Sequence, residues 1–144
     1  MTNKKEWYEV IEVGKTIEVA KTVSETDVYL FAGISGDFAP VHINEEYMKK
    51  TQFKHRIAHG ALVMAYMSWA STVFASLYPF RSVSYGYDHV RFTKPVYIGD
   101  TVKIVYESRE KDLDKDTHKS LITATNQHGD VVAVAEHILK YFRD

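Results

Sequence analysis

The sequence contains no cysteine among its 144 residues. This absence excludes disulfide bonds, cysteine-ligated zinc and a cysteine nucleophile. A chain without cysteine fits a cytoplasmic protein, and the cytoplasm is the compartment that we expect. The N-terminal segment carries charges and lacks an apolar stretch, so it does not indicate a secretory signal.

The sequence also lacks an excess of charge of either sign, because its formal net charge is −1 and its pI lies near 6.7. Such a balance creates no field that would attract nucleic acid or an anionic membrane. One uncharged segment of eighteen residues, 61–78, contains several serines and has no second segment like it. This pattern favours a buried core helix over a membrane span. We therefore expect neither nucleic acid nor a membrane as a partner.

Proline is scarce, with three residues in the whole chain, and no Pro/Gly/Ser-rich linker, repeat or low-complexity tract interrupts the sequence. Hydrophobic residues make up 45% of the chain, which is enough for one substantial core. The simplest interpretation is a single domain over residues 1–144.

The first half of the sequence has helical signals. A capping-box pattern at residues 24–27 predicts a helix that ends near Ser35, before a glycine. Residues 36–43 are expected to form a loop, and residues 44–50 a short helix capped by an asparagine. Gly60 then opens the long apolar helix.

The second half of the sequence predicts antiparallel strands, from its alternating apolar residues and turn signals. The expected strands cover residues 82–94, 101–108, 118–127 and 131–142, with an earlier strand near 15–23. The charged run 107–119 is interpreted as the solvated end of a hairpin.

A long helix that is apolar all round must be covered by other elements. A curved antiparallel sheet wrapped around that central helix would cover it, so the pattern predicts an α+β hot-dog fold. Because one sheet cannot enclose the helix completely and its edge strands need partners, we expect a homodimer or a higher homo-oligomer.

The most informative stretch is Gly36-Asp37-Phe38-Ala39-Pro40-Val41-His42. A carboxylate and an imidazole that share one water are suited to proton transfer, and Asp37 and His42 are such a pair if the intervening segment folds back. Taken alone, Asp37 has the alternative role of a turn residue, and His42 that of an ordinary buried or surface histidine.

This stretch resembles the Gly-Asp-x-Asn-Pro-aliphatic-His signature of the MaoC-like, or hydratase-2, family of hot-dog proteins, which includes the (R)-specific enoyl-CoA hydratases. The segment 57–60, Ile-Ala-His-Gly, resembles the family's Ile-x-His-Gly motif before the central helix, and it ends eighteen residues after His42. Segments 87–92 and 94–100 resemble the family's strand and turn, so the likeness covers roughly residues 15–142.

The resemblance implies a function and a role for each matching residue. Asp37 and His42 would hold and deprotonate a water, then supply a proton to the α-carbon of an acyl thioester, and the N–H of Gly60 would receive the thioester carbonyl. Ser68, Pro40 and His59 would support the site. The reaction would be hydration of a 2-enoyl thioester to an (R)-3-hydroxyacyl thioester, or the reverse dehydration.

The carrier of the acyl group is expected to be coenzyme A or an acyl carrier protein. Coenzyme A would enter only as part of the substrate, and no separate cofactor is expected. His55 and His59 lie four residues apart, but they lack the companion ligands of a metal motif, so we expect no metal. The basic cluster of residues 49–56 could bind the phosphates of coenzyme A or simply be a solvated helix end.

The sequence departs from the family pattern at Ala39, where the signature has asparagine. Alanine cannot make the local hydrogen bonds of an asparagine side chain, so a difference in substrate preference is expected. Two alternatives stay open, namely a hot-dog acyl-CoA thioesterase and a non-catalytic acyl-thioester-binding subunit.

Overall fold

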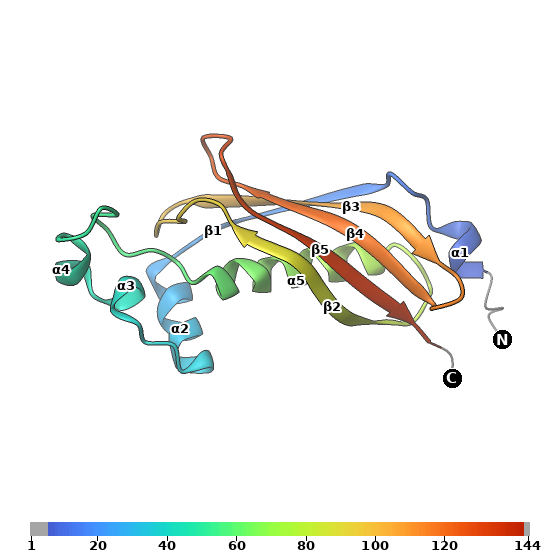
Figure 1. The fold of residues 1–144 in the computed structure, drawn as a ribbon, viewed down its shortest axis with the longest axis horizontal. Coiled ribbons are helices and arrows are strands. Elements are labelled where there is room, and N and C mark those ends of the chain that lie inside the picture. The colour runs from blue at the N-terminus through green and yellow to red at the C-terminus, as the bar shows by residue number, and fades with distance from the viewer. Residues whose placement is uncertain (1–5, 143–144) are drawn as a thin grey trace.

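The computed structural model describes residues 6–142 of the chain. Helices and strands follow one another in the order shown in Figure 1. The helices are α1 (Glu6–Val10), α2 (Glu25–Ser35), α3 (Pro40–Ile43), α4 (Glu45–Met48) and α5 (Gly60–Ala75). The strands are β1 (Thr16–Thr22), β2 (Ser82–Phe92), β3 (Thr101–Asp112), β4 (Thr117–Thr125) and β5 (Val131–Tyr141).

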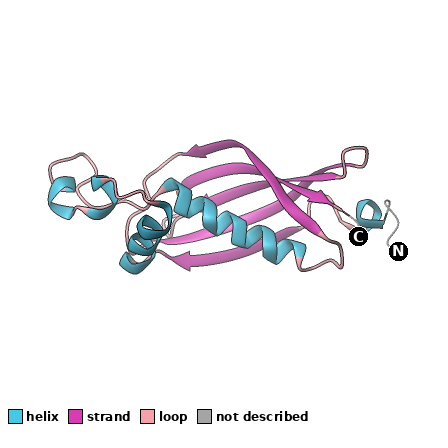
Figure 2. Ribbon diagram, turned by 90° about the horizontal axis from the view of Figure 1, so that it is seen from below, coloured by secondary structure: helices cyan, strands magenta, loops and turns pink. Residues whose placement is uncertain are grey.

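The strands form one antiparallel sheet in the order β1-β3-β4-β5-β2, so β1 and β2 are its edges. Figure 2 shows α5 lying along one face of this sheet, with the shorter helices α2, α3 and α4 gathered beyond one end of it. The predicted α+β hot-dog architecture is therefore confirmed.

The core lies between α5 and the sheet. Met67, Ala70 and Phe74 of α5 are fully buried, as are Ile104 and Tyr106 of β3. Burial of each large apolar side chain stabilises the fold by about 1.5–3 kcal/mol.

The opposite stripe of α5 is exposed. It carries Ala61, Ala65, Ser68 and Trp69, and the indole of Trp69 is 43% exposed. One copy of the chain therefore covers its central helix on one side only.

The sequence signals that predicted the two ends of a helix are confirmed at α2. Ser24 and Asp27 form the capping box, each side chain accepting the other residue's backbone N–H at 3.0 Å. Gly36 ends the helix in the left-handed region, with φ of 81°, where a side chain would be strained. The Asn44 side chain caps α4 as predicted, although that helix ends at Met48 rather than Lys50.

Two short helices were not predicted from the sequence. The expected loop over residues 36–43 instead contains α3, which starts at Pro40 because proline is favoured in the first turn of a helix. Helix α1 packs through its buried Trp7, whose indole stacks on the ring of Tyr141 with centroids 4.4 Å apart.

Residues 107–119 form the outer end of the β3–β4 hairpin, as predicted, and none of their Asp, Glu, Lys or Arg side chains is buried, but the strands run further into this segment than expected. Strand β3 continues to Asp112 and β4 begins at Thr117, so only residues 113–116 turn. The inward-facing side chains here are polar, which removes the apolar alternation that marks a strand in the sequence.

The inward-facing side chains at this level form what we call the inner polar row, Ser108, Ser120, His137 and Tyr87, which are aligned across four strands by the sheet register. His137 Nδ1 lies 2.7 Å from the Tyr106 hydroxyl, and its Nε2 lies 2.8 Å from Ser84 Oγ.

Two residues before Ser120 on β4, His118 Nε2 lies 2.7 Å from Ser108 Oγ. Burial is the main reason that the pKa values of His118 and His137 are lowered to about 4. Both imidazoles are therefore neutral at pH 7.

No helix within residues 6–142 combines the length and the apolar character needed to cross a membrane. The buried hydrophobic residues of the described part form a core cluster that extends from α1 to β5. The single domain over residues 1–144 stays a prediction.

Candidate active site

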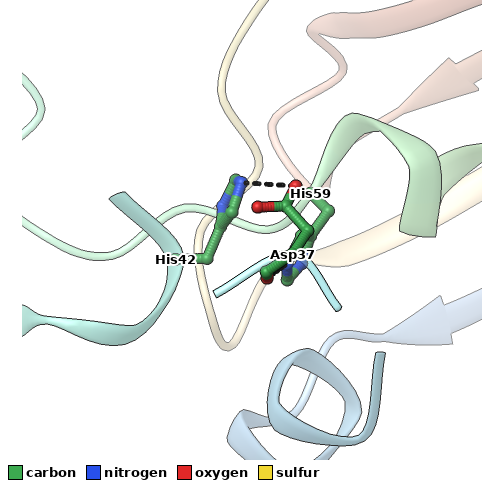
Figure 3. Close-up of side chains that lie close together, drawn as sticks. All are labelled: Asp37, His42 and His59. Atoms are coloured by element: carbon green, nitrogen blue, oxygen red, sulfur yellow. Dashed lines mark hydrogen bonds and ion pairs between the residues drawn. The ribbon is translucent and has the colours of Figure 1, made fainter. Parts of the chain in front are cut away.

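The side chains of Asp37 and His42 face each other at the end of the molecule where α2, α3 and the start of α5 meet (Figures 1 and 3). His42 Nε2 lies 3.9 Å from Asp37 Oδ2. The imidazole is 13% exposed and the carboxylate 53% exposed. A separation of 3.9 Å is too long for a direct hydrogen bond, but one water can lie about 2.8 Å from both atoms.

Asp37 is held in place by three hydrogen bonds. Its backbone N–H donates to Ser35 Oγ at 3.1 Å, and its backbone carbonyl lies 2.9 Å from His59 Nε2. Its carboxylate Oδ1 accepts the backbone N–H of Ala39 at 3.2 Å. The left-handed turn at Gly36 brings Asp37 to this position, and Oδ2 stays directed at His42.

His42 is oriented by a backbone carbonyl. Its Nδ1 lies 2.7 Å from the carbonyl oxygen of Ile57, which can only accept a hydrogen bond, so Nδ1 carries the proton in the neutral ring. Nε2 is then free of a proton and directed at Asp37. Ile57 is itself fixed, because its N–H donates to the Val41 carbonyl at 3.0 Å and it forms a β-bridge with Tyr97.

His59 lies beneath this pair as the N-cap residue of α5 and is 1% exposed. Its ring stacks on that of His42 with centroids 3.8 Å apart, and the ring of Phe31 packs against it at 4.8 Å. The structure therefore brings together Asp37, His42 and His59 (Figure 3).

Gly60 is the first residue of α5, so its backbone N–H has no partner within the helix and lies at the positive end of the helix dipole. The ring of Phe92 lies directly over the Gly60 Cα. A Cβ placed there would be 2.5 Å from Phe92 Cε2, so the Phe92 ring would have to move to accommodate a side chain at this position.

A pocket of about 390 Å³ joins His42 to Gly60. This volume lies at the lower end of the range for small-molecule sites, about 300–1,000 Å³. Its walls are mainly apolar, and one cation, Lys94, lies in them. The remaining lining residues are Phe53, Ile57, Ala58, Val63, Phe92, Thr93, Pro95, Val96 and Val132. Phe53 and Phe92 are functional candidates that the sequence did not indicate.

None of the three predicted supporting residues lines this pocket: His59 lies beneath the Asp37–His42 pair, and the other two lie elsewhere. Pro40 forms the start of α3 and so sets the helix that carries His42. Ser68 lies on the exposed stripe of α5, beside Tyr87 of β2. Burial raises the pKa of Tyr87, and the hydroxyls of Ser68 and Ser84 partly offset that effect. Ser68 therefore does not lie beside Asp37 and His42.

Lys49, His55 and Arg56 of the basic cluster of residues 49–56 are paired with neighbouring carboxylates. Arg56 bonds Glu25 at 2.6 Å and Glu45 at 2.8 Å, and these bonds are the main reason that its pKa is raised. His55 Nδ1 lies 2.9 Å from the same Glu45. These contacts tie α4 to α2 and occupy Arg56 and His55, whereas Lys50 and Lys54 are exposed.

A helix N-terminus, an aspartate–histidine pair and an adjoining apolar pocket, arranged on a hot-dog sheet, define a hydratase-type hot-dog protein. Residues 9–131 match the sequence model of the MaoC like domain. The chain therefore belongs to the MaoC-like domain family, as its motifs indicated.

Two of the similar proteins are named as a hydratase and a dehydratase, which are carbon–oxygen lyases. The chain is 44% identical to the (R)-specific enoyl-CoA hydratase of Rhodospirillum rubrum over 96 residues, which are 67% of this chain and 65% of that enzyme. It is 33% identical to the 3-hydroxybutyryl-CoA dehydratase of Methylorubrum extorquens over 128 residues, or 89% of this chain and 78% of that enzyme.

A solved structure is similar as well. The R-hydratase of Pseudomonas aeruginosa in its unliganded form has a TM-score of 0.80 and 35% identity, and the match covers 95% of this chain and 86% of that one.

Proposed function

We propose that this chain adds water to the C2–C3 double bond of a 2-enoyl thioester to give an (R)-3-hydroxyacyl thioester, and removes it in the reverse direction. The observation that carries this proposal is the proton-free Nε2 of His42, which lies 3.9 Å from Asp37 Oδ2 beside a pocket that reaches Gly60. The names of the relatives point to the same reaction.

In the hydration direction, a water held between Asp37 and His42 gives a proton to His42 Nε2 while its oxygen bonds to C3. The π electrons of the double bond move towards the thioester carbonyl, and its oxygen gains negative charge. The N–H of Gly60 stabilises this oxygen, a kind of contact worth about 10²–10³ in rate. A proton delivered to C2 from the Asp37–His42 pair completes the addition.

A thioesterase is the second candidate function for this protein. Its reaction breaks the C–S bond and needs a nucleophile or an activated water at the carbonyl carbon. Asp37 and the proton-free Nε2 of His42 could activate that water as well as one that attacks C3. The names of the relatives, hydratase and dehydratase, therefore favour hydration over hydrolysis.

The substrate that we propose is an acyl group on coenzyme A or on an acyl carrier protein. Coenzyme A serves only as part of that substrate, with no separate cofactor and no metal. The exposed stripe of α5 and the open edge of β2 support a homodimer, in which a second copy covers them. The cytoplasm remains the expected compartment.

One assay separates the candidates. Purified protein is incubated with crotonyl-CoA while enoyl absorbance and free thiol are both followed. Hydration predicts loss of absorbance without thiol, and hydrolysis predicts free thiol. Binding with neither signal would identify a non-catalytic subunit and refute the proposal.

The roles of the two residues are tested by Asp37→Asn and His42→Ala. Each should lower turnover by about 10²–10⁴-fold, because general acid–base groups contribute that much. Asp114→Asn, at an exposed carboxylate in the turn between β3 and β4, is the matched control and should retain full activity. If either site variant is folded and turns over substrate as fast as the wild type, the proposed roles of the two residues are wrong.

A further inference from the structure

His59 contacts both members of the Asp37–His42 pair. It is the N-cap residue of α5, but its side chain makes no capping hydrogen bond to that helix. The side chain instead points to Asp37 on one side and His42 on the other (Figure 3). At 1% exposure, the ring is among the most buried polar groups of the site.

The first contact of His59 is with the backbone of Asp37. Its Nε2 lies 2.9 Å from the Asp37 carbonyl oxygen. That oxygen can only accept, so Nε2 carries the proton and Nδ1 does not. Within residues 6–142, Nδ1 is buried and has no hydrogen-bond partner. The ring therefore uses its only N–H to fix the residue that presents the carboxylate.

The second contact is with the ring of His42. The two imidazoles stack with centroids 3.8 Å apart and planes inclined by 28°. The Nδ1–H bond to Ile57 fixes one point of the His42 ring but leaves rotation about that bond. The face of His59, backed by Phe31 at 4.8 Å, removes this freedom. The distance from Nε2 to Oδ2 then depends on both contacts.

The three side chains also offer ligand atoms within 4.8 Å of one another, as a metal site would. The stacking argues against that use. The lone pair of an imidazole nitrogen lies in the plane of the ring, so two nearly parallel rings direct their lone pairs side by side rather than at one ion. Binding through His59 Nε2 would also break its bond to Asp37.

We infer that His59 is a positioning residue, which sets the gap between Asp37 and His42 for one water through two separable contacts. This inference rests on the hydration proposed above. A misplacement of about 1 Å at a reacting group can cost about 10²-fold in rate. The loss should appear in kcat, since His59 does not line the pocket that binds the acyl group.

Three substitutions separate the contacts. His59→Gln keeps a side-chain N–H that can reach the Asp37 carbonyl but removes the ring, His59→Phe keeps the ring but removes the N–H, and His59→Ala removes both. We expect kcat to fall about tenfold in each of the first two variants and about 100-fold in the third, with KM within about twofold. In a His42→Ala background His59→Gln should cost almost nothing, because the ring acts through His42, whereas His59→Phe should still lower kcat through Asp37.

A raised KM with unchanged kcat, or an undiminished loss from His59→Gln in the His42→Ala background, would overturn the inference. The wild-type protein supplies a test that needs no variant. Nitrogen-15 spectra of its histidines should show the Nε2–H form at His59 and the Nδ1–H form at His42, and the opposite tautomer at His59 would refute the inference. A wild type with these tautomers but no hydration would refute the proposed function alone.

Discussion

Mild acid should destabilise this protein through the two buried histidines of its sheet. His118 and His137 have pKa values lowered to about 4, against an ordinary value of 6.5. Below pH 6.5 the unfolded chain binds protons at both residues while the folded chain does not. The free energy of unfolding therefore falls as the pH drops from about 6.5 towards 4, and the loss levels off below that.

The size of the effect follows from the two pKa values. At pH 5, a histidine whose pKa falls from 6.5 to about 4 on folding costs about 2 kcal/mol relative to neutral pH, so the pair costs about 4 kcal/mol. A typical domain has about 5–15 kcal/mol of stability in total. Carboxylates contribute little to this window, since they titrate mostly below pH 5.

Urea unfolding at pH 7 and pH 5 measures the loss directly. His118→Gln retains a group that can bond Ser108 and cannot be protonated, so the difference between the two pH values should shrink by about half. His128→Gln, at an exposed position in the turn before β5, should behave like the wild type. A wild-type free energy that changes by less than about 1 kcal/mol between pH 7 and pH 5 would refute the reasoning.

Three further results are expected. Gly60→Ala should lower kcat/KM, because its Cβ would lie 2.5 Å from the Phe92 ring. Adding Phe92→Ala should recover part of this loss. A Gly60→Ala variant with the kcat/KM of the wild type would contradict the packing argument. Ala39→Asn should supply the side-chain N-cap that α3 lacks and so raise Tm. It should also shift the relative kcat/KM values among short, branched and longer enoyl thioesters. If these relative values do not change, position 39 does not shape the site. Light scattering at micromolar concentration should give a dimer or larger, and a monomer would contradict the exposed stripe of α5 as an interface.

Local signals in the sequence were enough to predict most of the fold. Helix α2 was predicted because both of its ends carry their own chemistry, the capping box of Ser24 and Asp27 and the left-handed Gly36. The strand ends near residue 112 could not be predicted from such local signals. The inward positions of Ser108, His118 and Ser120 are polar, and the burial of the first two is explained by the hydrogen bond between them, which the sequence does not reveal.

Most residues of the candidate site were likewise predictable from the sequence. The motif placed Asp37, His42 and Gly60, and the structure brings them to one end of the molecule. The carbonyl of Ile57 and the ring of Phe31 carry no sequence signal, because a backbone oxygen is present at every position and a phenylalanine is most often core. Ser68 lies eight residues after Gly60, about 12 Å along α5, and on the exposed stripe of that helix, so the structure does not bring it to the pocket.

The parts of the site differ in how firmly they are held. Gly60 begins α5, whose buried side chains pack on the sheet, whereas Asp37 and His42 belong to a segment of two four-residue helices and connecting loops. Such segments open locally at a lower free energy than a packed core. Warming should therefore separate the acid–base pair while the sheet and α5 remain closed, so that catalysis ceases at a temperature where the protein is still folded.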